Sequence, residues 1–285
     1  MYKLLIVFIL LKSINLEAQV ITDSIKCEGH YRTFHYNNPV NKKKNSLMFV
    51  LHGSGGNGKD MMKSAGSFEE KTKAEGLLVV YPDGYEKYWN ECRKAATSTA
   101  NILNINENVF FAGMIDYVNK RFKINKQQVF AFGVSGGGHM VYKLALTMPG
   151  KFKAITAVIA NLPDTNNLDC VEARRPLPVM IINGTADPVN PYNGGPMSVA
   201  NAVWGNVRST DRTVKYWAEL AGYSGQPAKE NLPDTDTTDG KTIERYTYKE
   251  KGKPEVVLLK VIGGKHDFPN DINVFEEAWK FFKRQ

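Results

Sequence analysis

The sequence predicts an α/β fold in which a mostly parallel central sheet is covered by helices on both faces. From Ser46 onward, apolar runs of strand length alternate with segments whose apolar residues recur every three or four positions. The runs lack polar alternation, which is typical of parallel strands buried on both faces. With 285 residues, of which 42% are hydrophobic, the chain is long enough for one sizeable globular domain.

Seven segments are the expected strands, and they lie at 47–51, 77–81, 129–132, 155–159, 179–182, 242–248 and 256–261. Helical periodicity between them predicts helices over 105–122, 139–146 and 275–282. Residues 222–239, rich in Gly, Pro, Asp and Thr, are expected to form a surface loop of the same domain.

Residues 1–18 have the pattern of a signal peptide. Lys3 precedes an apolar run at 4–11, and Ala18 supplies a small residue at the cleavage site. A buried first strand is the alternative interpretation. The run is shorter than the roughly 20 apolar residues of a membrane span, so we expect none. The predicted product is one domain over 19–285, secreted or periplasmic after cleavage near Ala18.

An oxidising compartment and three cysteines, Cys27, Cys92 and Cys170, predict one disulfide and one leftover thiol, although the sequence does not select the pair. No zinc-type spacing is present, so no metal site is expected. The net charge of +8 includes the lysines of 41–45, which we interpret as a solvated turn. The remaining charge could favour acidic polymers, but no basic stripe interleaved with aromatic residues predicts a nucleic-acid partner.

The stretch VFAFGVSGGGH, residues 129–139, has the three parts of a nucleophile elbow: a buried strand, a Gly-x-Ser-x-Gly turn and a helix. Gly133 and Gly137 leave room where side chains would collide with the neighbouring strand and helix. The helix N-terminus favours developing negative charge near Ser135. We therefore interpret Ser135 as a nucleophile, with a purely structural glycine turn as the alternative.

The chain order Ser, acid, His in this architecture selects the partners of the serine. Of five histidines, three precede Ser135 and His139 lies on the same helix, which leaves His266 in a glycine-rich loop after a strand. Asp187 comes just past the buried run 179–182, at the carboxyl end of a strand, where such sites assemble. An ordinary surface histidine and an aspartate that caps an Asp-Pro turn are the alternatives.

A second glycine-rich loop, HGSGGNG at 52–58, follows the strand at 47–51 and suits an oxyanion hole. We assign its two donors to the backbone N–H groups of Ser54 and Gly136. Phosphate binding is the competing interpretation. It fails because Gly58-Lys59 lacks a following Ser or Thr and the glycine spacing of a P-loop.

Seven ordered motifs together resemble the secreted esterases of the polyhydroxybutyrate depolymerase and feruloyl esterase group, which belong with carbohydrate esterase family 1. They are His52-Gly53, Tyr81-Pro-Asp-Gly84, Trp89-Asn90, Gly133-Val-Ser-Gly-Gly137, Gly184-Thr-Ala-Asp187, Pro191-Tyr-Asn-Gly-Gly195 and Gly263-Gly-Lys-His266. The resemblance runs from about Gly29 to the C-terminus. It implies the α/β-hydrolase fold and a triad of Ser135, Asp187 and His266.

Two departures from the family pattern weaken the transfer of a substrate preference. Val134 and Gly136 flank the serine, where these esterases often have His or Leu before it and Asn or Ala after it. The segment Glu107-Asn-Val-Phe-Phe111 stands where they often carry an acidic pair followed by Val-Gly-Phe.

The expected reaction is two-step hydrolysis of an ester, without a cofactor, by a monomer. Trp89, Tyr192, Trp204 and Phe268 are candidates to line an acyl pocket, although aromatic residues near a hydrolase core are more often packing. Feruloyl or acetyl esters of plant polysaccharide are the first expectation, and a polyhydroxyalkanoate polyester is the alternative. A peptidase and a catalytically dead carbohydrate-binding protein are the rival functions.

Overall fold

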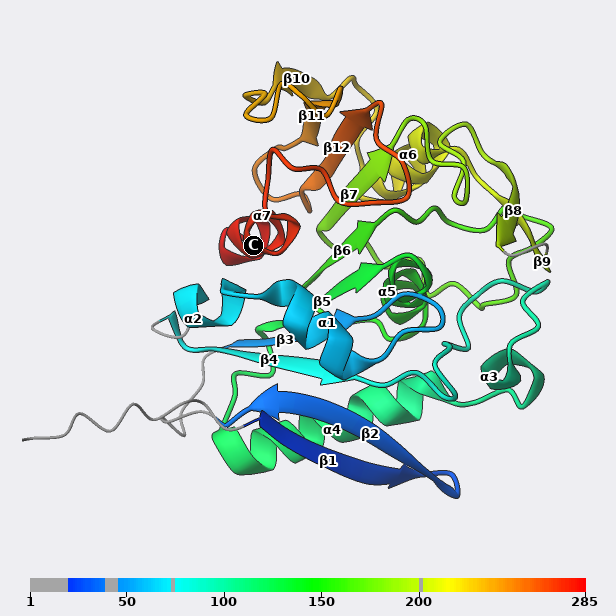
Figure 1. The fold of residues 1–285 in the computed structure, drawn as a ribbon, viewed down its shortest axis with the longest axis vertical. Coiled ribbons are helices and arrows are strands. Elements are labelled where there is room, and N and C mark those ends of the chain that lie inside the picture. Colours follow the sequence, from blue (N-terminus) through cyan, green and yellow to red (C-terminus); the bar gives the residue numbers. More distant parts are fainter. Residues whose placement is uncertain (1–19, 39–45, 73–74, 200–201) are drawn as a thin grey trace, which may run out of the picture.

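A ten-stranded sheet runs through the protein, and helices cover both of its faces (Figure 1). The computed structural model describes residues 20–38, 46–72, 75–199 and 202–285. The expected signal peptide, residues 1–18, and the lysine-rich turn at 41–45 lie outside the described residues and stay predictions.

The strands of this sheet and of one separate two-stranded ribbon are β1 Val20–Cys27, β2 His30–Asn37, β3 Ser46–Leu51, β4 Leu77–Pro82, β5 Val129–Val134, β6 Ala154–Val158, β7 Val179–Gly184, β8 Gly195–Val199, β9 Ala202–Val207, β10 Ala228–Asn231, β11 Thr242–Tyr248 and β12 Val256–Ile262. The helices are α1 Gly58–Ala65, α2 Phe68–Thr72, α3 Thr99–Ile102, α4 Glu107–Phe122, α5 Gly136–Thr147, α6 Thr210–Leu220 and α7 Val274–Lys283. None of these helices is long and apolar enough to cross a bilayer.

The strand order is β1-β2-β4-β3-β5-β6-β7-β12-β11-β10, and strands β8 and β9 pair separately. The central strands from β4 to β12 are parallel to one another. Antiparallel strands complete both edges, with β1 and β2 on one side and β11 and β10 on the other. The mostly parallel sheet predicted from continuous apolar runs is therefore confirmed, since every residue of β3, β4, β5, β6 and β7 is buried.

Two apolar cores lie on the two faces of the sheet. One contains α4, α5 and α6, whose side chains include Phe110, Met140 and Trp217. The other contains α1, α2 and α7, with Phe68 and Phe275 among its buried rings. Side chains of each central strand alternate between the two cores, because successive residues of a strand point to opposite faces. The sheet is therefore a rigid layer whose strand ends can hold side chains in place.

Several elements were not expected from the sequence. The hairpin of β1 and β2 extends the sheet beyond β4, through pairs such as Phe34 with Pro82. The segment at 222–239, expected to be entirely a loop, contains the exposed edge strand β10. The helix after the Gly-x-Ser-x-Gly turn begins at Gly136 rather than at His139, because a helix N-terminus tolerates glycines that periodicity cannot detect. Edge strands that are half exposed carry a weaker apolar signal than buried ones.

A disulfide joins Cys92, in the segment after β4, to Cys170, in the segment after β6. Their Cα atoms are 5.1 Å apart. Cys27 is a buried free thiol. The expectation of one disulfide and one thiol is thus confirmed, and the tertiary structure selects the pair that the sequence left open.

Removing this disulfide is expected to lower the free energy of unfolding by about 2–4 kcal/mol, because it closes a long loop and restricts the unfolded chain. The two cysteines are 78 positions apart. The measurement is the urea midpoint of Cys92→Ser/Cys170→Ser against the oxidised parent. Cys27→Ser is the matched control. Equal midpoints for the oxidised parent and the double variant would contradict the expected role.

Candidate active site

Ser135 lies at the tip of a sharp turn between β5 and α5. Its φ of 52° and ψ of −116° place a non-glycine residue in a strained region of backbone conformation. The turn closes because a β-carbon at Gly133 would overlap the carbonyl of Gly137, so only glycine fits there. Hydrogen bonds from the backbone N–H of Ser135 to the carbonyl of Val158 and from that of His139 to the carbonyl of Ser135 hold it, both at 2.9 Å.

His266 connects Ser135 to Asp187. The serine Oγ lies 2.9 Å from Nε2 of the imidazole, and Nδ1 lies 2.8 Å from Oδ2 of the aspartate. With a carboxylate accepting at Nδ1–H, the imidazole Nε2 is free to accept the serine proton. The structure therefore brings together three residues that are up to 131 positions apart in the sequence.

The carboxylate of Asp187 is fixed by the turn in which it lies. Its Oδ1 accepts hydrogen bonds from the backbone N–H groups of Val189 and Asn190, each at 2.8 Å. The side chain is 1% exposed, whereas that of His266 is 22% exposed. A buried, doubly anchored carboxylate thus orients an imidazole that remains accessible from the cavity above Ser135.

His52 fixes the loop after β3 through two hydrogen bonds. Gly84 N–H donates to Nε2 of His52 at 2.9 Å, so Nδ1 carries the proton and donates to the carbonyl of Gly53 at 2.7 Å. Burial lowers the pKa of His52, which favours this neutral tautomer. With the Gly53 carbonyl held by His52, the neighbouring N–H of Ser54 is left for the cavity.

Ser54 and Gly136, the expected oxyanion donors, are close neighbours. A β-carbon built on Gly136 would lie 2.9 Å from the backbone nitrogen of Ser54. Gly136 is also the first residue of α5, where backbone N–H groups lack partners within the helix. The two backbone segments that carry the expected donors therefore meet beside Ser135, as an oxyanion hole requires.

A cavity of about 340 Å³ opens above Ser135. Its lining combines the reacting groups with an apolar wall and one cation, and consists of Gly53, Ser54, Arg93, Val134, Ser135, Ile159, Val189, Met197, Trp204 and His266. Among the described residues, no group of three or more His, Cys, Asp or Glu side chains could hold a metal ion.

Of the four aromatic residues expected at an acyl pocket, Trp204 lines the cavity and the other three do not. Trp89 is 3% exposed, and its Nε1 donates a hydrogen bond to the carbonyl of His52, which fixes the start of the loop after β3. The hydroxyl of Tyr192 donates a hydrogen bond to Oδ1 of Asp211 at 2.9 Å. Phe268 packs edge-on against Phe275 in the core beneath α7. Trp89 and Phe268 therefore pack beneath neighbouring segments, while Tyr192 lines a different cavity, of about 290 Å³, together with Asp211.

Three residues of the site have roles that the sequence did not indicate. His52 stands in the glycine-rich loop and in the His52-Gly53 motif, but its hydrogen bond from Gly84, a residue 32 positions away, depends on the fold. Arg93 and Met197 line the cavity, yet neither belongs to a motif. The position of Arg93 directly after Cys92 was the available sign that its segment could be held in place, because a disulfide restricts the chain around it.

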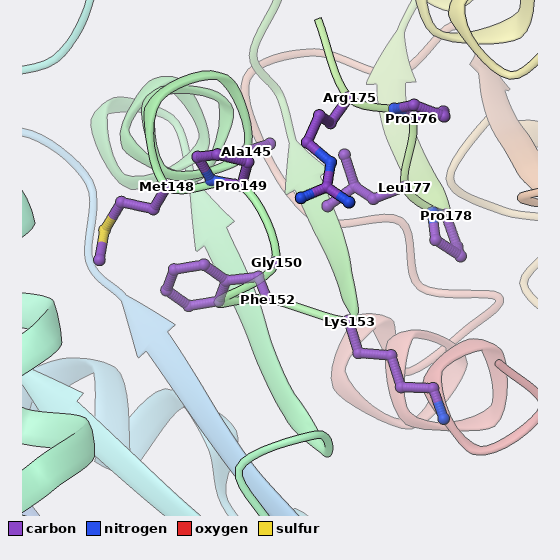
Figure 2. A pocket seen from close by; sticks show the side chains of 10 residues that line it. All are labelled: Ala145, Met148, Pro149, Gly150, Phe152, Lys153, Arg175, Pro176, Leu177 and Pro178. Atoms are coloured by element: carbon purple, nitrogen blue, oxygen red, sulfur yellow. The ribbon is translucent and has the colours of Figure 1, made fainter. Parts of the chain in front are cut away.

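A second cavity, of about 150 Å³, lies at the opposite end of the sheet (Figure 2). It is formed where α5 ends and where the chain enters β6 and β7, and Lys153 and Arg175 are among its lining residues. Ser135 follows β5 at the carboxyl ends of the parallel strands, so this cavity at their amino ends is separate from the candidate active site.

Comparison with known proteins gives relatives at low identity. The chain is 27% identical over 233 residues to a protein of Nocardia uniformis subsp. tsuyamanensis that is named as an esterase, NocK; the match covers 78% of this chain and 65% of the relative. It is also 27% identical over 169 residues to feruloyl esterase C of Emericella nidulans, covering 58% and 56% of the two chains. The match thus spans less than two thirds of the length of these relatives. No protein-family model matches the chain.

The fold is shared with solved esterase structures. An acetyl xylan esterase from Aspergillus awamori superposes with a TM-score of 0.64 at 15% identity, over 94% of this chain and 100% of that one. The chain has the α/β-hydrolase fold. The relatives that it matches at 27% identity are named as esterases. The fold implied by the sequence motifs is therefore confirmed.

The α/β-hydrolase is expected to lose stability on mild acidification. Burial lowers the pKa of His52, and lowers that of His139 well below its ordinary 6.5, with the charges of Arg93 and His266 adding to the effect on His139. The unfolded chain gains a proton at each histidine as the pH falls through about 6.5, whereas the folded protein does not, so the folded state loses stability.

Between pH 7.5 and 5.5 the share of His139 in this loss is on the order of 1 kcal/mol. The measurement is the urea-derived free energy of unfolding at both pH values for the parent and for His139→Met. The variant should show a correspondingly smaller decrease. The same decrease in both proteins would mean that His139 does not cause it.

Proposed function

We propose that this α/β-hydrolase is a serine esterase that hydrolyses carboxylic esters, with feruloyl or acetyl groups on plant polysaccharide as its substrates. The observation that carries the proposal is the continuous hydrogen-bonded series from Ser135 through His266 to Asp187, beside two backbone N–H donors. The names of the sequence relatives, an esterase and a feruloyl esterase, support the same reaction class.

In the first step, Oγ of Ser135 attacks the ester carbonyl carbon while Nε2 of His266 takes its proton. The oxyanion of the tetrahedral intermediate accepts hydrogen bonds from the N–H groups of Ser54 and Gly136. Asp187 stabilises the imidazolium without taking its proton. Collapse of the intermediate breaks the bond to the alkoxy oxygen, which receives the proton from His266, and an acyl-serine remains.

In the second step, water replaces the alcohol. His266 removes a proton from the water as its oxygen attacks the acyl carbon, and the same oxyanion donors stabilise the second tetrahedral intermediate. Breaking the bond to Oγ releases the carboxylic acid and returns the proton to Ser135. The apolar wall of Val134, Ile159 and Val189 would contact the acyl or alcohol chain.

We also propose that the enzyme acts outside the cytoplasm, as a monomer, after cleavage near Ala18. The Cys92–Cys170 disulfide supports this location, because disulfides persist in oxidising compartments.

Replacing the nucleophile tests the reaction. Ser135→Ala is expected to lower kcat for a 4-nitrophenyl ester by at least about 10⁴-fold, because no other group takes its place. The parent should bind a fluorophosphonate probe covalently, and the variant should not. An unchanged circular dichroism spectrum is the folding control. Retained turnover in the folded variant would refute the assignment of Ser135.

The acyl preference is tested with methyl ferulate, acetylated xylan and hydroxybutyrate oligomers. Turnover of the first two, above that of the third, is the expected result. Turnover of only short nitrophenyl esters would reject the polysaccharide substrate while leaving the esterase chemistry in place.

The oxyanion donors are tested by Gly136→Ala. The new methyl group would overlap Ser54 and displace one N–H donor, so kcat should fall by about 10²- to 10³-fold. Gly225→Ala is the matched control, because a β-carbon there meets nothing within 4 Å. An unchanged kcat in Gly136→Ala would place the oxyanion elsewhere.

A further inference from the structure

A buried cation forms part of the wall of the active-site cavity. Arg93 lines the same cavity as Ser135 and His266, although only 2% of its side chain is exposed. Its Nε donates to Oε1 of Glu91 at 2.8 Å, and Glu91 is also 2% exposed. Placing a charged pair out of water costs several kcal/mol per ion before the attraction is counted. A simple apolar acyl pocket does not need such a pair.

The guanidinium keeps donors that the protein does not use. Nη1 donates to Sδ of Met197 at 3.1 Å, and a thioether is a weak acceptor. Within the described part of the chain, Nη2 has no acceptor. The indole Nε1 of Trp204, which also lines the cavity, is buried and likewise has no acceptor among the described residues.

Arg93 and Trp204 are held together as one unit. The guanidinium carbon lies 5.1 Å from the centre of the Trp204 ring. Asn167 accepts from the backbone N–H of Ala95 and donates to the carbonyl of Trp204, at 2.9 and 3.1 Å, so it fixes the segments that carry both side chains. Cys92, directly before Arg93, is held by its disulfide. Donors on such a rigid frame are preorganised for a ligand.

Arg93 is the cation of this neighbourhood that reaches the cavity. Arg32 pairs with the fully buried Glu107, and Arg93 pairs with Glu91. The Nζ of Lys143 donates to the carbonyl of Asn90, and Asp169 is a further carboxylate within electrostatic range of this lysine. The charges of these side chains balance, and of the three cations Arg93 lines the cavity, where an anion would meet its guanidinium.

We propose that Arg93, assisted by the indole N–H of Trp204, binds a carboxylate carried by the ester substrate. This inference rests on the proposed esterase function and names a substrate class for it: esters with a free carboxylate on the acyl or the alcohol part. A guanidinium whose outer nitrogens are bonded only to a weak thioether acceptor can donate to the oxygens of a carboxylate, which neither a feruloyl nor an acetyl group possesses. Arg93 is then a specificity-determining residue rather than only half of an ion pair.

The test compares pairs of esters that differ in charge and hardly in shape. For the acyl side, the pair is the 4-nitrophenyl monoesters of adipic acid and of adipamic acid. For the alcohol side, it is 3-acetoxybenzoate and 3-acetoxybenzamide. We expect kcat/KM to favour the carboxylate in one pair by about 10- to 100-fold, the range for hydrogen bonds to charged groups. The preferred pair identifies which part of the substrate lies at Arg93.

The variant Glu91→Gln/Arg93→Gln removes both charges without leaving one unpaired, and it should bring the ratio close to 1. Trp204→Phe should lower it less, since the ring is retained and one donor is lost. Arg245→Gln/Glu277→Gln is the matched control. It removes an ion pair between β11 and α7 whose side chains do not line the cavity, and it should leave the ratio unchanged.

Two results would overturn the proposal: kcat/KM ratios near 1 in both pairs for the parent, or an unchanged ratio in the Glu91/Arg93 double variant. In either case, hydrolysis of the neutral esters would still support the esterase function. If the double variant does not fold, Arg93→Lys is the replacement test. It keeps the positive charge but loses the planar guanidinium donors, so it should still lower the kcat/KM ratio. If the parent hydrolyses none of the four esters, the esterase function fails instead. Calorimetry with adipate and adipamate on Ser135→Ala then tests the carboxylate subsite alone, and equal binding would overturn it.

Discussion

The hydrogen bond between Asp187 and His266 is the interaction on which the candidate active site depends. It joins the loops that follow β7 and β12, which are parallel neighbours with Gly184 opposite Val261. The loops meet backbone to backbone, because a β-carbon at Gly184 would overlap the carbonyl of Gly264. This close approach brings the imidazole within reach of both the carboxylate and Ser135. The strained turn at Ser135 is useful only because the imidazole is already in place.

A second constraint, a buried polar network, shapes the opposite wall of the cavity. Glu107 accepts from Arg32 at 2.9 Å and from the backbone N–H of Asn90, while Glu91 holds Arg93. Burial raises the pKa of both glutamates, which shows that desolvation opposes their ionisation despite the cations beside them. Such a network contributes defined geometry more than net stability. It keeps the segment before Cys92 in one conformation next to the reacting serine.

Features set by residues close together in the sequence were predictable, whereas features set by contacts between distant segments were not. The buried strands and the turn at Ser135 were predictable, because apolar runs and glycine spacing are local. Chain order was sufficient to select His266 and Asp187, which the structure joins to the serine. Composition was insufficient for the cavity wall: of four aromatic candidates, only Trp204 lies there, and Arg93 went unnoticed. Whether a side chain faces a cavity or a core depends on elements packed from distant parts of the chain.

The sequence by itself determined the α/β architecture, the buried central strands and the three residues that meet at the carboxyl end of the sheet. These follow from hydrophobic period and from glycines whose small size is required locally. Only the tertiary structure decided which cysteines pair, how His52 holds the loop beside Ser54, and that a buried guanidinium faces the same cavity as the serine. Each of these depends on contacts between segments tens of residues apart, and such contacts leave no periodic trace in one sequence.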